Sequence, residues 1–152
     1  MLILSKKERN AFEKEIYAQI DKALLAGLTI VHLDSHYHIH TMPAFCKLFI
    51  KAAKKYNLKL RLAQSYNQGN YITFLYRSWL NNHIKKSGSA YCDIFQDVQH
   101  YLDFAKTAES NFSVEIMLHP DLDNLGNLTD HYHPQTMAMW LEFLSQNGQR
   151  LR

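Results

Sequence analysis

The chain has 152 residues, 47% of them hydrophobic and 20% charged, which indicates one globular domain over residues 1–152 and excludes a disordered chain. With 17 Lys and Arg against 14 Asp and Glu, the net charge of +3 is too small to favour nucleic acid as a partner. No apolar run approaches the roughly 18 residues of a membrane-spanning helix, and the opening Met-Leu-Ile-Leu is too short for a signal-peptide core. We therefore expect a cytoplasmic protein with no membrane partner.

The beginning of the chain predicts a helix and then a strand. Ser5 and Glu8 have the spacing of a helix capping box. Apolar residues then recur at helical spacing and predict a buried stripe of Phe12, Ile16, Ile20, Ala23 and Leu24. Gly27 stands where a helix ends in a left-handed residue. Residues 29–33 are rich in β-branched side chains and predict a strand.

The rest of the chain continues this alternation. Pro43 suits the first turn of a helix that Asn57 ends, and residues 58–62 predict a second strand. The further expected elements are a loop at 63–71, helices at 72–86 and 94–108, a strand at 112–118, a loop to about residue 129, and a closing helix with Met137, Trp140, Leu141 and Leu144 on its apolar face. Strands that alternate with helices predict an α/β fold with mainly parallel strands. Cys46 and Cys92 form no CxxC motif and predict reduced core thiols.

Histidine is the one unusual component, because four of the nine histidines lie between His32 and His40. In an extended chain the side chains of Asp34, His36, His38 and His40 project the same way. One carboxylate and three imidazoles are a donor set for Zn²⁺ or a similar cation, and sites in parallel α/β folds lie beyond the carboxyl ends of strands. The alternative is a group of surface and core histidines without a shared role.

Two more residues close predicted strands. His119 ends the third strand and suits a general acid, since imidazole titrates near neutrality; a capping histidine before Pro120 is the alternative. Arg61, near the end of the second strand, suits an anionic or hydroxyl-rich ligand or the Asp34 carboxylate, and a surface arginine is the alternative.

A group of aromatic residues follows the second strand: Tyr66, Tyr71, Tyr76 and Trp79. They suit a wall that stacks against sugar rings. Their helical spacing favours the other interpretation, that they belong to the core.

Four sequence elements resemble the YdjC-like carbohydrate deacetylases, a family that includes chitooligosaccharide deacetylases and the hopanoid-pathway deacetylase. The elements are Glu15-x-x-x-Gln19-Ile20, Asp34-Ser35-His36-x-His38-x-His40-x-x-Pro43, Arg61, and Glu115-Ile116-Met117-x-His119-Pro120. The resemblance implies a (β/α) barrel-like fold. It also implies a divalent metal, Zn²⁺ or Mg²⁺, that activates water against the amide of an N-acetylated sugar or oligosaccharide.

The resemblance covers only the C-terminal part of such a deacetylase. The family's early Asn-Ala-Asp-Asp-Phe-Gly element and its Gly-x-His element do not occur here, and 152 residues are fewer than the roughly 250 of a closed barrel. We therefore expect a partial barrel-like fold. We also expect either a homo-oligomer or a partner that supplies the N-terminal half.

We expect functional roles for six residues of this chain. His36 and His38 are the expected metal ligands, with the order between them open. His119 and Asp34 are the expected catalytic residues, and Arg61 and His40 the expected substrate-binding residues. The alternative functions are a non-catalytic half-barrel that binds metal or sugar or serves as a subunit, and a histidine cluster that only buffers metal.

Overall fold

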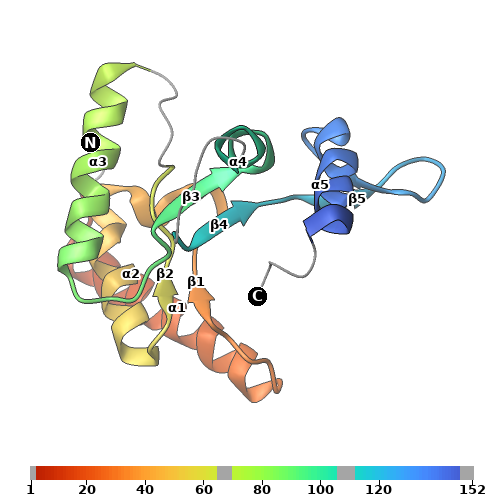
Figure 1. The fold of residues 1–152 in the computed structure, drawn as a ribbon. Helices are drawn as coiled ribbons and strands as arrows, with labels where there is room; N and C mark the ends of the chain where they lie inside the picture. Colours follow the sequence, from red (N-terminus) through yellow and green to blue (C-terminus); the bar gives the residue numbers. More distant parts are fainter. Residues whose placement is uncertain (1–2, 65–69, 106–111, 148–152) are drawn as a thin grey trace. The chain divides into compact units, whose positions relative to one another are not determined.

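The computed structural model describes residues 3–64, 70–105 and 112–147, and these gather into two compact units (Figure 1). The first unit holds the described residues up to Phe95 together with residues 112–115. The second unit holds residues 96–105 and 116–147.

The first unit begins with two helices whose ends the local sequence explains. Its elements are α1 (Lys6–Leu25), β1 (His32–Leu33), the 3₁₀ segment η1 (His36–Thr41), α2 (Pro43–Tyr56), β2 (Lys59–Leu60) and α3 (Tyr71–Lys86). The predicted capping box is confirmed, because the Glu8 amide donates to Ser5 Oγ at 3.3 Å and the Ser5 amide to Glu8 Oε2 at 2.7 Å. Gly27 is left-handed, at φ 79°, as predicted. Asn57 ends α2, also in the left-handed conformation.

Strands β1 and β2 are parallel and pair in the register His32 with Lys59 and Leu33 with Leu60. They are shorter than the five residues predicted for each. Helix α2 packs against this pair and against α1, and it buries one face: Phe45, Cys46, Leu48, Phe49, Ile50, Ala52 and Ala53. Cys46 is buried and Cys92 half-buried, and both are free thiols.

The second unit is built around two helices and a hairpin. Its helices are α4 (Val98–Ala105) and α5 (Pro134–Asn147), and β5 (Pro120–Leu122) pairs antiparallel with β6 (Leu128–Asp130). Its core is Val98, Leu102, Met137 and Trp140. Strands β3 (Ile94–Asp97) and β4 (Val114–Met117) pair, and each passes from the first unit into the second.

Two predictions about secondary structure were wrong. Residues 94–97 form strand β3, not the start of a helix; α4 begins only after Asp97, whose carboxylate accepts the His100 amide at 2.8 Å. The expected loop before residue 129 is the β5–β6 hairpin. Asp123 shapes its turn by accepting the Leu125 and Asn127 amides at 2.8 Å, and Gly126 supplies the positive φ of 81°.

The order of helices and strands confirms the α/β class. Strands β3 and β4 point the same way, as β1 and β2 do (Figure 1). The described residues form three two-stranded sheets and no barrel, so the partial barrel stays a prediction. Of the helices described, none is long and apolar enough to cross a membrane.

Candidate functional site

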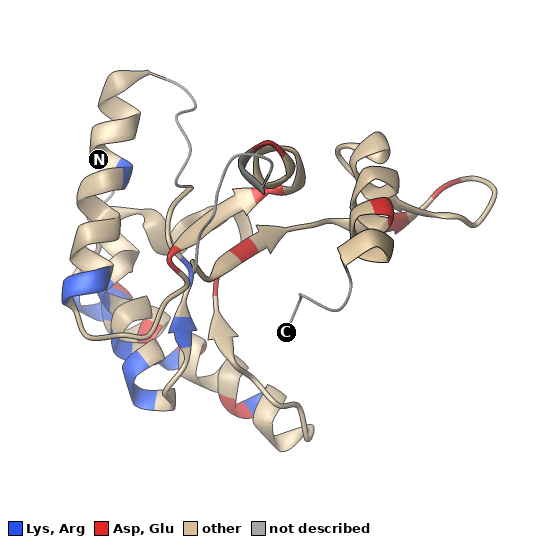
Figure 2. Ribbon diagram, in the orientation of Figure 1, with Lys and Arg blue, Asp and Glu red and all other residues tan. Residues whose placement is uncertain are grey.

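Three charged side chains meet beside the ends of β1 and β2. They are Asp34, which follows β1, Arg61, which follows β2, and Glu115 on β4. The Arg61 amide donates to the Leu33 carbonyl at 3.2 Å, which places Arg61 beside the end of β1. The Arg61 guanidinium forms an ion pair through Nη1 with Asp34 Oδ2, and its Nε donates to Glu115 Oε1 at 2.6 Å. Figure 2 shows this alternation of charge, with basic positions on and after β2 and acidic positions after β1 and on β4.

The guanidinium of Arg61 is held on several sides by protein. The Arg61 side chain is 13% exposed, and its Cζ lies 4.7 Å from the centre of the Phe95 ring. The sequence offered the Asp34 carboxylate as one possible partner of Arg61, and the structure shows this ion pair. Contact between Arg61 and a substrate stays a prediction.

The histidine-rich segment is not extended, and the prediction that its side chains project to one side was wrong. Residues 36–41 form the 3₁₀ segment η1, in which Tyr37 and His38 are left-handed at φ 52° and 54°. Ser35 Oγ accepts the His40 amide at 2.8 Å, and Thr41 Oγ1 donates to the His38 carbonyl at 2.8 Å. These side chain–backbone hydrogen bonds favour a turn over a strand.

His40 is enclosed within the first unit. Its side chain is part of the buried core at 1% exposure, and its Nδ1 lies 2.8 Å from Ser35 Oγ. Its Nε2 has no hydrogen-bond partner among the described residues. Burial, with the charges of His38 and Arg61 nearby, lowers the pKa of His40 to about 4, so the ring is neutral at pH 7. Substrate contact by His40 stays a prediction.

The two expected metal ligands lie in the same segment but face different surroundings. His36 is exposed and its ring contacts Tyr37, whereas the His38 ring lies 5.8 Å from Phe95 and 6.2 Å from His40. Within the described ranges, no three His, Cys, Asp or Glu side chains come together as a metal site. The described residues therefore do not fit a complete metal site on their own.

A cavity of about 550 Å³ opens beside the end of β1. It is mostly apolar and runs from the face of α1 to the strand end, where three polar residues line it: Asp34, Ser35 and His36. Its apolar lining is Phe12, Ile16, Ile20, Ala23, Ile30, Leu33, Ile39, Phe45 and Phe49. Glu15 and Gln19 add a polar edge on α1, joined by a hydrogen bond of 2.8 Å.

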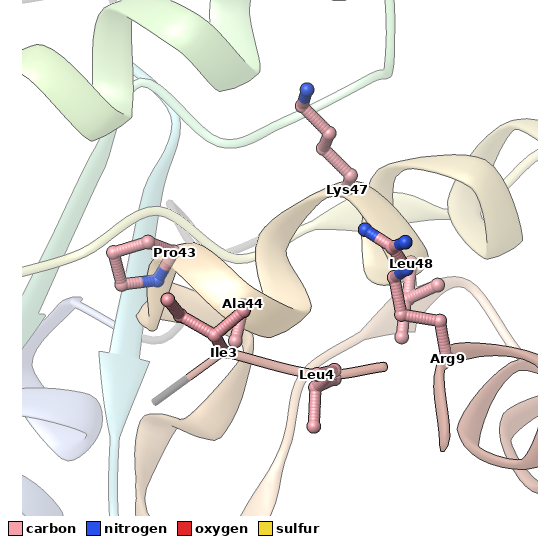
Figure 3. Close-up of a pocket in the computed structure, with 7 residues that line it drawn as sticks. All are labelled: Ile3, Leu4, Arg9, Pro43, Ala44, Lys47 and Leu48. Carbon is pink, nitrogen blue, oxygen red and sulfur yellow. The ribbon is translucent and has the colours of Figure 1, made fainter. Parts of the chain in front are cut away.

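A second cavity of about 240 Å³ lies between the start of α1 and the start of α2 (Figure 3). Ile3, Leu4, Pro43, Ala44 and Leu48 give it an apolar lining, and Arg9 and Lys47 stand at its edge. Lys47 points away from the apolar residues in Figure 3. None of the six expected site residues lines this cavity.

His119 belongs to the second unit, where Asp130 organises its surroundings. The Asp130 carboxylate is 3% exposed and accepts the amide of His119 at 2.8 Å and those of Tyr132 and His133 at 3.0 Å. Burial alone would raise the pKa of Asp130, but these backbone N–H groups hold it below its ordinary value. The His119 side chain is 39% exposed, with Nδ1 3.9 Å from Asp130 Oδ2 and the ring edge-on to Tyr132.

Sequence reasoning gave no role to Glu115, Ser35 or Asp130. The sequence does carry a signal for Glu115, because this charged residue lies between the apolar residues Val114 and Ile116 in the third predicted strand. Asp130 precedes a helix that begins with Pro134, which is a turn signal.

Two of the aromatic residues on α3 are exposed, so the interpretation that they belong to the core was wrong for these two. Tyr71 is 72% and Trp79 57% exposed. The ring of Trp79 stacks on Tyr76 and on His83, at centroid distances of 6.0 and 5.7 Å. The Tyr76 hydroxyl donates to the Thr41 carbonyl at the end of η1. Tyr66 lies outside the described residues.

The chain is similar to several proteins named carbohydrate deacetylase. The one from Brevibacillus brevis is 27% identical over 136 residues, which are 88% of this chain and 52% of that protein. The one from Oceanobacillus iheyensis is 31% identical over 109 residues, or 71% of this chain and 42% of that protein. A Vibrio cholerae protein of the same name is 45% identical over 51 residues, 34% of this chain and 20% of its own length.

The chain thus spans about half the length, or less, of the curated relatives it matches. No solved structure matches it. The family model described as YdjC-like protein matches residues 1–150, almost the whole sequence. On that match, the chain belongs to the YdjC-like protein family.

Proposed function

We propose that this chain is part of a metal-dependent carbohydrate deacetylase that hydrolyses the N-acetyl amide of amino sugars. Family membership and relatives named carbohydrate deacetylase support the reaction class. The observation that carries the proposal is Asp34, held by Arg61 next to the exposed His36 beyond the end of a parallel strand pair. Catalytic groups in parallel α/β folds lie at this position.

In the proposed reaction water adds to the amide carbonyl, the C–N bond breaks, and the amine leaves with a proton. His119 is the proposed donor of that proton, because its side chain is reachable and imidazole suits transfer near neutral pH. Asp34, 38% exposed and fixed by Arg61, is the proposed carboxylate that orients the attacking water or a neighbouring imidazole. The exposed aromatic stack at Trp79 is a proposed contact for the sugar rings.

The metal is proposed to be shared with protein that the described residues do not include. His36, or His38 in its place, is the proposed contribution of this chain. Since no complete site forms within the described ranges, no catalytic step of this chain is assigned to a metal. The resemblance implies that the other ligands come from the Asp-Asp and Gly-x-His elements of an N-terminal half.

A second candidate function is a non-catalytic module that binds sugar or serves as a subunit. The incomplete donor set among the described residues favours it. The two candidates differ in one outcome, which is whether turnover appears when the remaining half is supplied.

The test is acetate release from N-acetylglucosamine oligomers with added Zn²⁺, Co²⁺ or Mg²⁺. The chain is assayed alone and mixed with the part of the Brevibacillus brevis deacetylase that it does not cover. The deacetylase proposal expects turnover only in the mixture. Absence of turnover from a mixture that forms a complex would favour the non-catalytic module. A cytoplasmic location stays a prediction.

A further inference from the structure

Helices α1 and α2 run side by side in the same direction and end at the same side of the first unit. Lys51 Nζ donates to Glu13 Oε1 at 2.6 Å, and further along both helices the Tyr56 hydroxyl donates to Asp21 Oδ1 at 2.8 Å. Each helix is followed by one strand of the parallel pair β1 and β2. The two helix ends therefore lie on the amino-terminal side of this pair.

Three apolar side chains are exposed where α1 passes into β1. Leu25 is 89%, Leu28 60% and Val31 61% exposed. None of the three lines either of the cavities described above. Exposed apolar side chains that gather in one short stretch of chain mark a surface that contacts a protein or a membrane.

Exposed lysines flank these apolar residues. Lys22 lies one turn before Leu25 on α1, so the two side chains are on the same side of the helix. The Val31 carbonyl accepts the Lys59 amide at 3.1 Å, which places Lys59 beside Val31. Figure 2 shows further basic residues at the end of α2, where the last turn holds Lys54 and Lys55.

We call this part of the first unit the basal surface and define it by seven residues: Lys22, Leu25, Leu28, Val31, Lys54, Lys55 and Lys59. Residues 21–31 and 54–59 contain a single carboxylate, Asp21, which accepts the Tyr56 hydroxyl. A lysine in the last turn of a helix interacts favourably with the helix dipole, and this explains part of the positive charge. It does not explain why apolar side chains are exposed among the lysines.

The composition of the basal surface indicates lipid as its partner. Protein interfaces are enriched in aromatic residues, Met and Arg and depleted in Lys, and single-stranded nucleic acids stack on aromatic side chains. The exposed residues of the basal surface are aliphatic side chains and lysines instead. Proteins that lie on a membrane combine apolar side chains that enter the lipid with lysines that attract anionic headgroups.

We propose that the basal surface binds an anionic phospholipid bilayer from one side. Leu25 and Leu28 enter the boundary between headgroups and acyl chains, and the four lysines contact lipid phosphates. The prediction of no membrane partner rested on the lack of a spanning segment, which a peripheral contact does not need. Asp34 and Arg61 follow the strands that the basal surface precedes, so the candidate site lies at the opposite end of the strand pair.

The test is sedimentation of the full chain with vesicles of phosphatidylcholine alone or of phosphatidylcholine and phosphatidylglycerol in equal parts. We expect binding to the mixed vesicles only, and weaker binding as salt is added. Leu25→Ser/Leu28→Ser should weaken this binding about tenfold or more, because less apolar surface enters the lipid. The matched control is Ile72→Ser/Leu75→Ser, which changes two exposed apolar residues of α3 outside the basal surface and should leave the affinity unchanged.

A second pair of variants tests the lysines. Lys54→Gln/Lys59→Gln should weaken binding about thirtyfold, since each lysine near an anionic bilayer strengthens binding roughly fivefold. Lys6→Gln/Lys7→Gln removes the same charge from the other end of the 20-residue helix α1, about 30 Å away, and should leave the affinity almost unchanged. Far-UV circular dichroism checks that each variant keeps its helices.

Four results would overturn the proposal. The first is no binding to the mixed vesicles. The second is equal weakening by the two lysine variants, because binding would then follow net charge, and the third is full binding by Leu25→Ser/Leu28→Ser. The fourth is loss of vesicle binding when the part of the Brevibacillus brevis deacetylase that the chain does not cover forms a complex with it, because that protein would then cover the basal surface. The test does not measure acetate release, so its outcome is independent of the proposed function.

Discussion

Replacing Arg61 by methionine should destabilise the first unit by about 2–4 kcal/mol. The variant leaves Glu115, 15% exposed, without its guanidinium partner, and a hydrogen bond to a charged group contributes about 1.5–3 kcal/mol. Loss of the guanidinium over Phe95 adds about 0.5–1 kcal/mol. The pair with Asp34 adds little, since that carboxylate is 38% exposed and water screens it.

The assay is urea unfolding at pH 7 followed by far-UV circular dichroism. With a slope of about 2 kcal/mol per molar urea, the midpoint should fall by roughly 1–2 M. Lys51→Met is the matched control, because Lys51 Nζ also lies 2.6 Å from a glutamate oxygen, Glu13 Oε1, but Lys51 is 62% exposed. Water screens an exposed pair of this kind, so its loss should shift the midpoint much less. Equal midpoint shifts in the two variants would refute the reasoning.

Three further predictions concern His40, the His36 and His38 pair, and Trp79. Because the pKa of His40 is lowered to about 4 in the folded chain, the unfolded chain binds a proton at His40 between pH 7 and pH 5 that the folded chain does not bind. The free energy of unfolding should therefore fall by about 2 kcal/mol from pH 7 to pH 5. In His40→Asn, urea unfolding should show a pH dependence that lacks this contribution. Zn²⁺ should bind the chain alone only weakly. Identical heats of Zn²⁺ binding in calorimetry for the chain and the His36→Ala/His38→Ala variant would show that these histidines do not bind the metal. N-acetylglucosamine oligomers should shift the indole N–H resonance of exposed Trp79 and not that of buried Trp140, and no shift at Trp79 would exclude a sugar contact there.

The parts of the fold that were predicted correctly are those set by signals within one turn of chain. The Ser5 and Glu8 box, Pro43 at the start of α2 and left-handed Asn57 at its end each act over at most four residues. Strand β3 was missed because the short apolar run at Ile94 suits a helix or a strand, and its partner β4 lies far along the chain. Pairing at that separation has no local signature.

The candidate site was predicted in part for the same reason. The Asp34 and Arg61 contact joins the ends of two neighbouring predicted strands, so it was among the expected possibilities. Glu115 reaches Arg61 from 54 residues away, and nothing local indicates that. The prediction that residues 36–40 are extended was wrong because hydrogen bonds of the Ser35 and Thr41 side chains to the backbone turn the chain. The alternation of side chains along a strand, on which the prediction rested, takes no account of such hydrogen bonds.

The central claim is that this chain supplies a histidine, His36 or His38, to a deacetylase completed by another half, and one measurement tests it most directly. Acetate release from N-acetylglucosamine oligomers is compared for three mixtures with the complementary Brevibacillus brevis part, containing the unaltered chain, the His36→Ala/His38→Ala variant or His133→Ala. His133 is an exposed histidine without a proposed role. We predict turnover with the unaltered chain and with His133→Ala, and a loss of roughly a hundredfold or more with the His36→Ala/His38→Ala variant. Full turnover by the mixture with that double variant, or robust turnover by the 152-residue chain alone, would contradict the account.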